Sequence, residues 1–298
     1  MDISFNPILA FSWSVLAGFL MAMGAGGGGI LAGIGHISIL GIGDANTIKA
    51  INQLLELTSR FFSVPLYLKQ KRLVWPLALS FGIGAPFGAI TGSWVSSTYL
   101  GNIDNYKSAF GILVLLVAGR TLYEALIKAK KRSHSLQKSF TTSNYIQNGQ
   151  SETSNKSNHI PRITHLGILH TEVSIGPDIF SFNPLVCISG GFVISFIGAT
   201  MGVGGGFLVT PFMVSILLFP MFFVVGTALV ALMIPLTASI LTYLYLNTTI
   251  DWTLVMIEIP GIAIGSIIGP FVNRRINERF LRLFVAAILF AIGLYYLI

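Results

Sequence analysis

Charged residues and cysteine are both scarce in this sequence. Lys, Arg, Asp and Glu make up 10% of the 298 residues, whereas 53% are hydrophobic and the mean hydropathy is +0.78. So little charge cannot coat a soluble globule of this size, and we therefore predict an integral membrane protein. Cys187 is the single cysteine, so neither an internal disulfide nor a thiolate metal site can form. We expect no metal centre and no cofactor.

Several sequence patterns are also missing. Strand-type alternation is absent from the apolar stretches, which argues for membrane helices rather than a barrel. No Ser/His/Asp triad, HExxH or CxxC pattern occurs, so we do not expect an enzyme. No Gly-Lys-Ser/Thr follows a glycine cluster, which excludes a nucleotide phosphate loop.

The net charge of +7 does not indicate a nucleic-acid partner, because 14 of the 18 Lys and Arg lie in three stretches. These stretches are Lys69 to Arg72, Lys128 to Asp178 and Asn273 to Arg282. Basic loops beside membrane helices stay on the cytoplasmic side. We therefore place all three stretches in the cytoplasm and predict a multi-pass protein of the plasma membrane.

A glycine-rich phrase occurs twice. Met-Gly-Ala-Gly-Gly-Gly-Gly at 23–29 returns as Met-Gly-Val-Gly-Gly-Gly at 201–206, and each copy follows an apolar run that begins with Ser-Phe-Asn-Pro. Further on, the same intervals separate a tryptophan from three glycines in each half: Trp75, Gly84, Gly88 and Gly92, then Trp252, Gly261, Gly265 and Gly269. We interpret the chain as a duplicated unit.

The duplication defines the expected fold, which is an all-α polytopic membrane protein. Residues 1–128 form the first transmembrane repeat and residues 178–298 the second. Residues 129–177 are rich in Ser, Asn, Thr, Gln, Lys and His, so we predict a flexible cytoplasmic linker. The apolar segments of the first repeat are expected at 7–23, 30–42, 46–68, 73–98 and 105–128. Those of the second are expected at 181–201, 207–219, 221–246, 252–272 and 280–298.

The positions of the basic loops predict inverted repeats with both termini outside the cytoplasm. Inverted repeats require an odd number of membrane crossings in each repeat, and three longer segments already supply three. The two pieces that flank each glycine cluster must therefore add either no net crossing or two crossings. The pieces after the glycines have about 13 residues, fewer than the roughly 20 that a full span needs. Each repeat is therefore expected to contain a glycine-broken helical hairpin plus three transmembrane helices. Whether the flanking pieces span fully or re-enter stays open.

Glycine-rich backbone inside a membrane protein is tolerated where it is buried in protein or lines a cavity. A helix that begins directly after such a cluster presents free N–H groups and the positive end of its dipole to an anion. Two such sites in inverted halves are typical of a secondary transporter. The alternative is that the glycines only allow close helix packing, which is our interpretation of the glycines at 84, 88, 92, 261, 265 and 269. The candidate substrate-binding glycines are Gly26, Gly27, Gly28, Gly29, Gly204, Gly205 and Gly206.

Polar residues inside the apolar segments are the other site candidates. Glu56 and Arg60 have the i,i+4 spacing of a self-neutralising pair, and the alternative is that Arg60 contacts the anion and Glu56 releases it. Glu258 has no basic residue within a helical turn, so a proton carrier and a neutral hydrogen-bonded side chain are both open. The proton-coupling candidates are Glu56 and Glu258. The further substrate-binding candidates are His36, Asn52, Gln53, Arg60, Thr210 and Thr227.

The paired glycine phrases, Phe207-Leu208-Val209-Thr210-Pro211, Gly226-Thr227 and the two-half layout resemble the sulfite exporter family of TauE/SafE type, also called the 4-toluene sulfonate uptake permease family. The resemblance covers nearly the whole chain except the linker. It implies transport of a sulfur-containing anion such as sulfite, an organosulfonate or thiosulfate.

We therefore expect an alternating-access secondary transporter for such an anion. The expected partners are the small anionic substrate, a proton as coupling ion and the lipid bilayer, with no nucleic acid; a homodimer is left open. The alternatives are a channel or a carrier for another solute, such as a metal cation. The sequence leaves the exact anion, the direction of transport and the coupling ion undecided.

Overall fold

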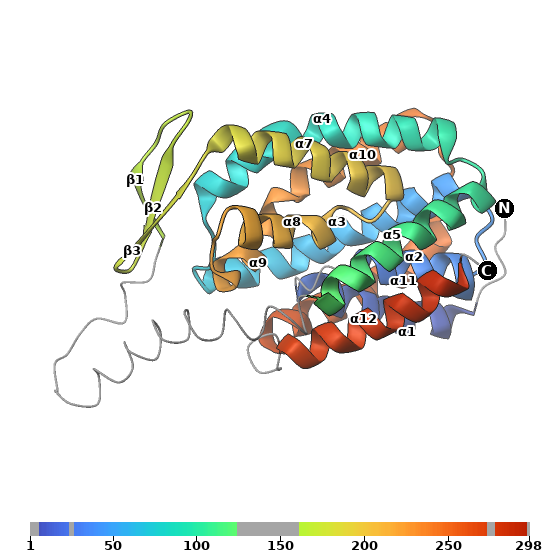
Figure 1. Ribbon diagram of the computed structural model, residues 1–298. Helices are drawn as coiled ribbons and strands as arrows, with labels where there is room; N and C mark the ends of the chain where they lie inside the picture. Colours follow the sequence, from blue (N-terminus) through green and yellow to red (C-terminus); the bar gives the residue numbers. More distant parts are fainter. Residues whose placement is uncertain (1–5, 24–26, 124–160, 273–277, 297–298) are drawn as a thin grey trace.

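The computed structural model describes residues 6–23, 27–123, 161–272 and 278–296, and it shows a bundle of helices with a small sheet at one end (Figure 1). The helices of the first repeat are α1 (Pro7–Ala22), α2 (Gly28–Ile34), the π-helical segment η1 (Gly35–Ile39), α3 (Ala45–Lys69), α4 (Trp75–Tyr99) and α5 (Ile103–Tyr123). Those of the second are α7 (Pro184–Met201), α8 (Gly206–Pro211), the π-helical segment η3 (Phe212–Ile216), α9 (Met221–Ala231), α10 (Met233–Tyr245), α11 (Trp252–Val272) and α12 (Glu278–Tyr295). The predicted polytopic helical membrane protein is confirmed.

The repeated Ser-Phe-Asn-Pro phrase is a helix start. The side chain of Asn6 accepts hydrogen bonds from the N–H groups of Ile8 and Leu9, and that of Asn183 accepts one from Leu185. The proline that follows each asparagine occupies the first helical position, where no N–H is needed and φ already suits a helix. The same four residues therefore start α1 and α7 in the same way.

The pieces after the glycine clusters are short helices, as predicted. Gly28–Ile39 and Gly206–Ile216 are each shorter than the roughly 20 residues that cross a hydrocarbon core. Each consists of an α-helical part followed by a π-helical turn at the corresponding place in its repeat. Among the described helices, four are long and apolar enough to span: Trp75–Tyr99, Pro184–Met201, Met221–Tyr245 and Trp252–Val272.

The glycines at four-residue intervals hold helices of different repeats together. A Cβ atom on Gly84, Gly88 or Gly92 of α4 would collide with the backbone of α7. A Cβ atom on Gly261, Gly265 or Gly269 of α11 would likewise collide with α1. Our packing interpretation of these glycines is confirmed. Because α4 packs on α7 and its counterpart α11 packs on α1, the two repeats are interlocked.

The predicted flexible linker is wrong for its last part, and the all-α fold gains a small sheet. Strands β1 (Arg162–His165), β2 (Thr171–Ile175) and β3 (Asp178–Phe182) form an antiparallel sheet in that order. In β2, buried and partly buried residues alternate, which is the period of a half-buried strand. Residues 129–177 are polar on average, so their composition did not indicate the short alternating segment of β2. The part of the predicted linker up to residue 160 lies outside the described residues.

The sheet packs against the helices through aromatic side chains. The ring of Phe219 lies 5.5 Å from that of Phe180 and 5.8 Å from that of Phe182, measured between ring centroids. Val173 and Ile175 of β2 belong to the same buried cluster as Phe219. The segment that leads into α7 is therefore part of the folded body.

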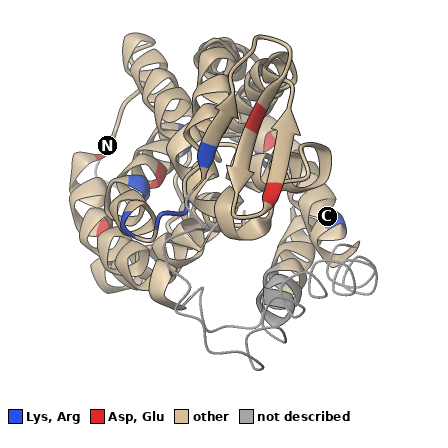
Figure 2. Ribbon diagram, turned by 90° about the vertical axis from the view of Figure 1, so that its left-hand side faces the viewer, with Lys and Arg blue, Asp and Glu red and all other residues tan. Residues whose placement is uncertain are grey.

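A basic loop lies at the same end of the bundle as the sheet. The Arg72 guanidinium lies 3.8 Å from the centre of the Phe222 ring at the start of α9, so the basic loop between α3 and α4 shares an end with the sheet. Figure 2 views this end and shows Lys and Arg on and beside the strands, with Asp and Glu also on the strands. The start of α1 and the end of α12 lie at the opposite end (Figure 1).

Candidate functional site

The two glycine clusters meet at one side chain of α3, the carboxylate of Glu56. A Cβ atom on Gly29 would collide with Oε1 of this carboxylate, and a Cβ atom on Gly204 would collide with Oε2. Only glycine at these two positions leaves room for the carboxylate. The tertiary structure therefore brings Gly29 of one repeat and Gly204 of the other to the same charged group. Gly26 lies outside the described residues.

Glu56 forms the predicted i,i+4 ion pair with Arg60. Arg60 Nη2 lies 2.7 Å from Glu56 Oε2, and Arg60 Nη1 donates to the backbone oxygen of Glu56 at 2.7 Å. Both residues are almost fully buried, with exposed fractions of 2% and 3%. A buried ion pair seldom adds net stability, because desolvation of two charges offsets their attraction. Net stabilisation of the fold therefore does not explain why this pair is buried.

A cavity lies beside this ion pair. It offers about 30 Å³ to the centre of a water-sized sphere, which is enough to hold water. The cavity is lined by Met21, Gly28, Gly29, Glu56, Arg60, Val203, Gly206, Val209, Thr210, Val225, Ala228, Leu229 and Leu232.

The cavity is electropositive apart from Glu56. The helices Gly28–Ile39 and Gly206–Ile216 both begin at its wall, and no side chain caps either start. Their first N–H groups have no partner within the helix and carry partial positive charge. A Cβ atom on Gly206 would lie 3.7 Å from Arg60 Nη2, so the guanidinium is next to the second helix start. The Glu56 carboxylate balances these positive groups.

Positive φ angles explain why the second cluster is glycine-rich. Gly202, Gly204 and Gly205 have φ values of +66°, +59° and +74°, a conformation that glycine adopts without the steric cost borne by other residues. The chain turns sharply there between α7 and α8. The turn places Gly204 against Glu56 and directs the start of α8 to the cavity.

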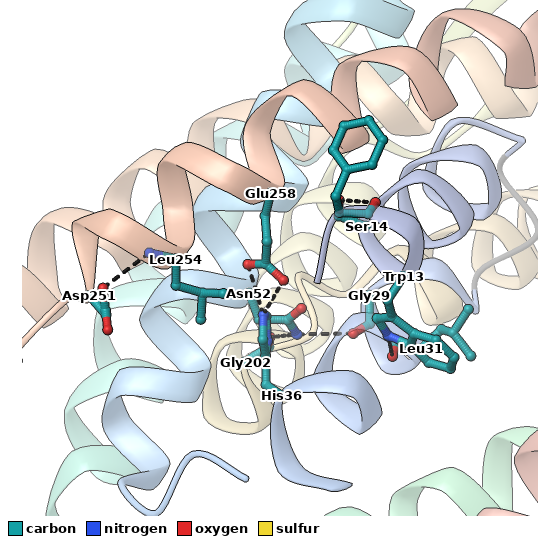
Figure 3. A network of polar contacts seen from close by, with 11 residues as sticks. Trp13, Ser14, Gly29, Leu31, His36, Asn52, Gly202, Asp251, Leu254 and Glu258 are labelled. Atoms are coloured by element: carbon teal, nitrogen blue, oxygen red, sulfur yellow. Dashed lines mark hydrogen bonds and ion pairs between the residues drawn. The ribbon is translucent and has the colours of Figure 1, made fainter. Parts of the chain in front are cut away.

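Asn52 and Gln53, two of the predicted polar partners, contact the clusters but do not line the cavity. Asn52 Nδ2 donates to the backbone oxygen of Gly29 at 2.9 Å and to that of Gly202 at 2.5 Å (Figure 3). Asn52 thus ties the two glycine segments to α3. Gln53 Nε2 donates to the backbone oxygen of Ala199 at 3.4 Å, and Gln53 lines a second, smaller cavity with Gly204.

The remaining predicted residues divide into three places. Thr210 lines the main cavity. Thr227 Oγ1 donates to the backbone oxygen of Phe223 and accepts from the N–H of Val74, so it joins α9 to the start of α4 and is not part of the cavity wall. His36 and Glu258 pair with each other in a separate place.

The sequence interpretation missed the apolar wall of the cavity and one buried cation. The wall residues of α9 have no polar signal, so only their position in space identifies them. Lys49 is fully buried, and its Nζ donates to Ser96 Oγ at 2.7 Å and to the backbone oxygen of Leu100 at 2.9 Å. Its place one helical turn before Gln53 on α3 could have marked it as buried. Within the part of the chain that the structure describes, no group of three or more His, Cys, Asp or Glu could hold a metal ion.

A buried charged site at the meeting point of two similar helical repeats, with spanning helices around it, defines a polytopic membrane protein of the transporter class. The family model for the sulfite exporter TauE/SafE matches residues 10–296, so the chain belongs to this family. The chain is also similar to the probable membrane transporter protein YunE of Bacillus subtilis (strain 168), with 24% identity over 229 residues, which is 76% of this chain and 71% of that protein. No solved structure matches the chain. The predicted family is confirmed.

Proposed function

We propose that this protein is a secondary transporter that moves a sulfur-containing anion of the sulfite, organosulfonate or thiosulfate class across the plasma membrane. The observation that carries the proposal is the cavity where both glycine clusters face the buried Glu56–Arg60 pair. Membrane transport agrees with the family and with YunE; the anion and the mechanism are our proposal.

The charges of the cavity favour an anion. Arg60 and two uncapped helix starts are positive, and a planar guanidinium can bind two oxygen atoms of an oxyanion at once. Glu56 occupies this positive environment in the described state. We propose that the incoming anion replaces Glu56 at Arg60, so the buried guanidinium always has an anionic partner. Thr210 lines the same cavity, and we propose that its hydroxyl group donates a hydrogen bond to the bound anion.

The arrangement of the repeats supports alternating access. The helices that start at the cavity come from different repeats, and the remaining helices are paired across the repeats. Rocking of one repeat against the other would open the cavity first to one side and then to the other. We propose that the end with the sheet and the Lys69–Arg72 loop is cytoplasmic, which places both termini outside.

The test is uptake into proteoliposomes that contain the purified protein. Sulfite, thiosulfate and 4-toluenesulfonate are compared with chloride, sulfate and a divalent metal cation, and empty liposomes measure leakage. We expect saturable flux of at least one sulfur anion. Non-saturating flux would indicate a channel, and flux of the metal cation alone would overturn the anion proposal.

The double variant E56Q/R60Q tests the site itself. Both charges are removed together, so neither remains buried without its partner. We expect the variant to fold and to lose saturable uptake of the sulfur anion, because the anion then has no cationic side chain to bind. Arg162→Leu is the control, because Arg162 is an exposed cation on β1. Uptake by E56Q/R60Q equal to that of the wild type would place the binding site elsewhere.

A further inference from the structure

His36 and Glu258 form a second buried polar pair, outside the cavity. His36 Nε2 lies 3.1 Å from both carboxylate oxygens of Glu258 (Figure 3). Each residue has an exposed fraction of 1%. His36 belongs to η1 of the first repeat and Glu258 to α11 of the second. The pair therefore joins the two repeats directly.

The pair has no other charged partner among the described residues. Helices α1 and α2 carry no ionisable group, and Glu258 is the only one in α11. The charged residues of α3 near this level are engaged elsewhere: Lys49 with Ser96 and Leu100, and Glu56 with Arg60. The other nearby ionisable groups are Asp44 and Asp251, which cap α3 and α11, and Tyr296, which contacts Ser38.

The fold itself does not require a polar pair at this place. Trp75 and Trp252 occupy equivalent positions in the two repeats. The same separation in sequence makes Met213 the counterpart of His36, and Phe81 the counterpart of Glu258. Both counterparts are buried in an apolar cluster, where the Phe81 ring lies 6.4 Å from that of Phe212. The same contact between a short helix and a long one is thus apolar in one half of the molecule and ionisable in the other. Buried ionisable residues in membrane segments are costly, which points to a function.

The pair is mechanically connected to the anion cavity. His36 lies in η1, which continues α2, and Gly29 in the first turn of α2 faces the Glu56 carboxylate. Asn52 of α3 binds the backbone oxygen of Gly29, and its Nδ2 would lie 3.6 Å from a Cβ atom on Gly33 of the same short helix. A displacement of η1 relative to α11 would therefore move the helix start that forms part of the cavity wall.

The imidazole can accept one proton. When Glu258 is ionised it only accepts hydrogen bonds, so in that state Nε2 carries the hydrogen between the two residues. Nδ1 of His36 is buried and has no hydrogen-bond partner among the described residues. A proton added at Nδ1 changes the net charge of the pair from −1 to zero, with the imidazolium stabilised by the carboxylate beside it. The pair can therefore take up and release a proton without leaving an unpaired cation in the membrane.

We propose that the His36–Glu258 pair is the proton-coupling site of this transporter. The inference rests on the proposed anion transport. One proton binds the pair from one side of the membrane and leaves to the other side in each cycle. The neutral pair and the anionic pair favour different positions of η1 against α11, and the cavity changes its accessibility with them.

The test uses sulfite in proteoliposomes under two conditions. The first is uptake driven by an imposed pH gradient, and the second is exchange of labelled for unlabelled sulfite at equal pH on both sides. Sulfite titrates in the same way for every variant, so differences between variants belong to the protein. We expect Glu258→Gln and His36→Gln to lose the stimulation by the pH gradient and to retain exchange. Thermal unfolding of each purified variant checks that it is folded.

The matched control is Glu172→Gln. Glu172 is also paired with a histidine, His170, at 3.0 Å, but this pair is on the exposed sheet. We expect this variant to respond to the pH gradient like the wild type. A folded Glu258→Gln or His36→Gln variant that keeps the full response would overturn the coupling role alone. Wild-type flux that ignores the gradient would do the same, whereas no wild-type flux of any sulfur anion would overturn the proposed function as well.

Discussion

At the residue scale, the main finding is that a carboxylate occupies the place expected for an anion. Glu56 lies where Gly29 and Gly204 leave room and where two helices begin. Its charge resembles that of a substrate oxyanion, so it can hold the positive groups in place while the site is empty. In the proposed function, substrate binding is therefore an exchange of one negative group for another, with the glycines providing the space and Arg60 the charge.

Gly206→Ala gives the sharpest test of this site. The added methyl group would lie 3.7 Å from Arg60 Nη2 and 3.8 Å from a methyl carbon of Leu232, which is ordinary contact distance. We therefore expect stability to change by less than about 1 kcal/mol. The methyl group points to the guanidinium, so the apparent affinity for the sulfur anion should fall by about tenfold, or about 1.4 kcal/mol.

The measurement is the concentration dependence of uptake, alongside thermal unfolding. Gly119→Ala is the control, since a Cβ atom at Gly119 of α5 meets no atom within 4 Å. An unchanged apparent affinity in Gly206→Ala would mean that the glycines of the second cluster serve the chain turn alone.

At the element scale, the sheet differs from the rest of the molecule because it precedes the second repeat and has no counterpart among the described elements of the first. It covers the end of the bundle near Phe219, and its strands connect directly to α7. We therefore expect the sheet to fix where the second repeat begins. The flexible linker predicted for residues 129–177 therefore does not include β1 and β2.

Val173→Asp tests the structural role of the sheet. Val173 has an exposed fraction of 1%, so an aspartate there would be a buried charge without a partner, at a cost of about 3 kcal/mol or more. Ile163→Asp is the control, because Ile163 faces Val173 across the strands and is 50% exposed. Thermal unfolding in detergent should show a lower midpoint for the first variant only. Equal midpoints would show that the sheet contributes nothing to the folded body.

At the scale of the whole molecule, helices of one repeat pack against helices of the other repeat. α4 and α7 pack together, and so do their counterparts α11 and α1. α5 and α12 pair with each other in antiparallel fashion, since Phe110 contacts Tyr296 while Leu115, further along α5, contacts Gly293. Neither repeat could bury these faces alone.

The proposed orientation can be tested by cysteine labelling in a Cys187→Ala background. We expect Thr248→Cys to react with a membrane-impermeant reagent in intact cells, because it follows α10 at the end away from the sheet. Ile168→Cys, which is 80% exposed at the tip of the sheet, should react only after the cells are opened. Reaction of Ile168→Cys and protection of Thr248→Cys in intact cells would reverse the orientation, and identical behaviour of the two would contradict the inverted arrangement.

The sequence alone determined the class of molecule, the duplication and the location of the helices. Apolar runs, the repeated Asn-Pro helix starts and the glycine intervals are local patterns, and each follows from backbone chemistry that acts within a few residues. The i,i+4 spacing of Glu56 and Arg60 predicted their ion pair for the same reason. The family followed from the same repeated phrases.

Only the tertiary structure decided which distant residues meet. Gly29 and Gly204 come together at Glu56, His36 finds Glu258 on another repeat, and Thr227 binds Val74 rather than the cavity. The sequence interpretation missed the sheet because β2 has only five residues. It lies in a polar stretch, and the average composition of that stretch outweighs the alternation of so few residues. Contacts between segments depend on how complete helices pack, and packing is set by the summed shape of many side chains rather than by any local pattern.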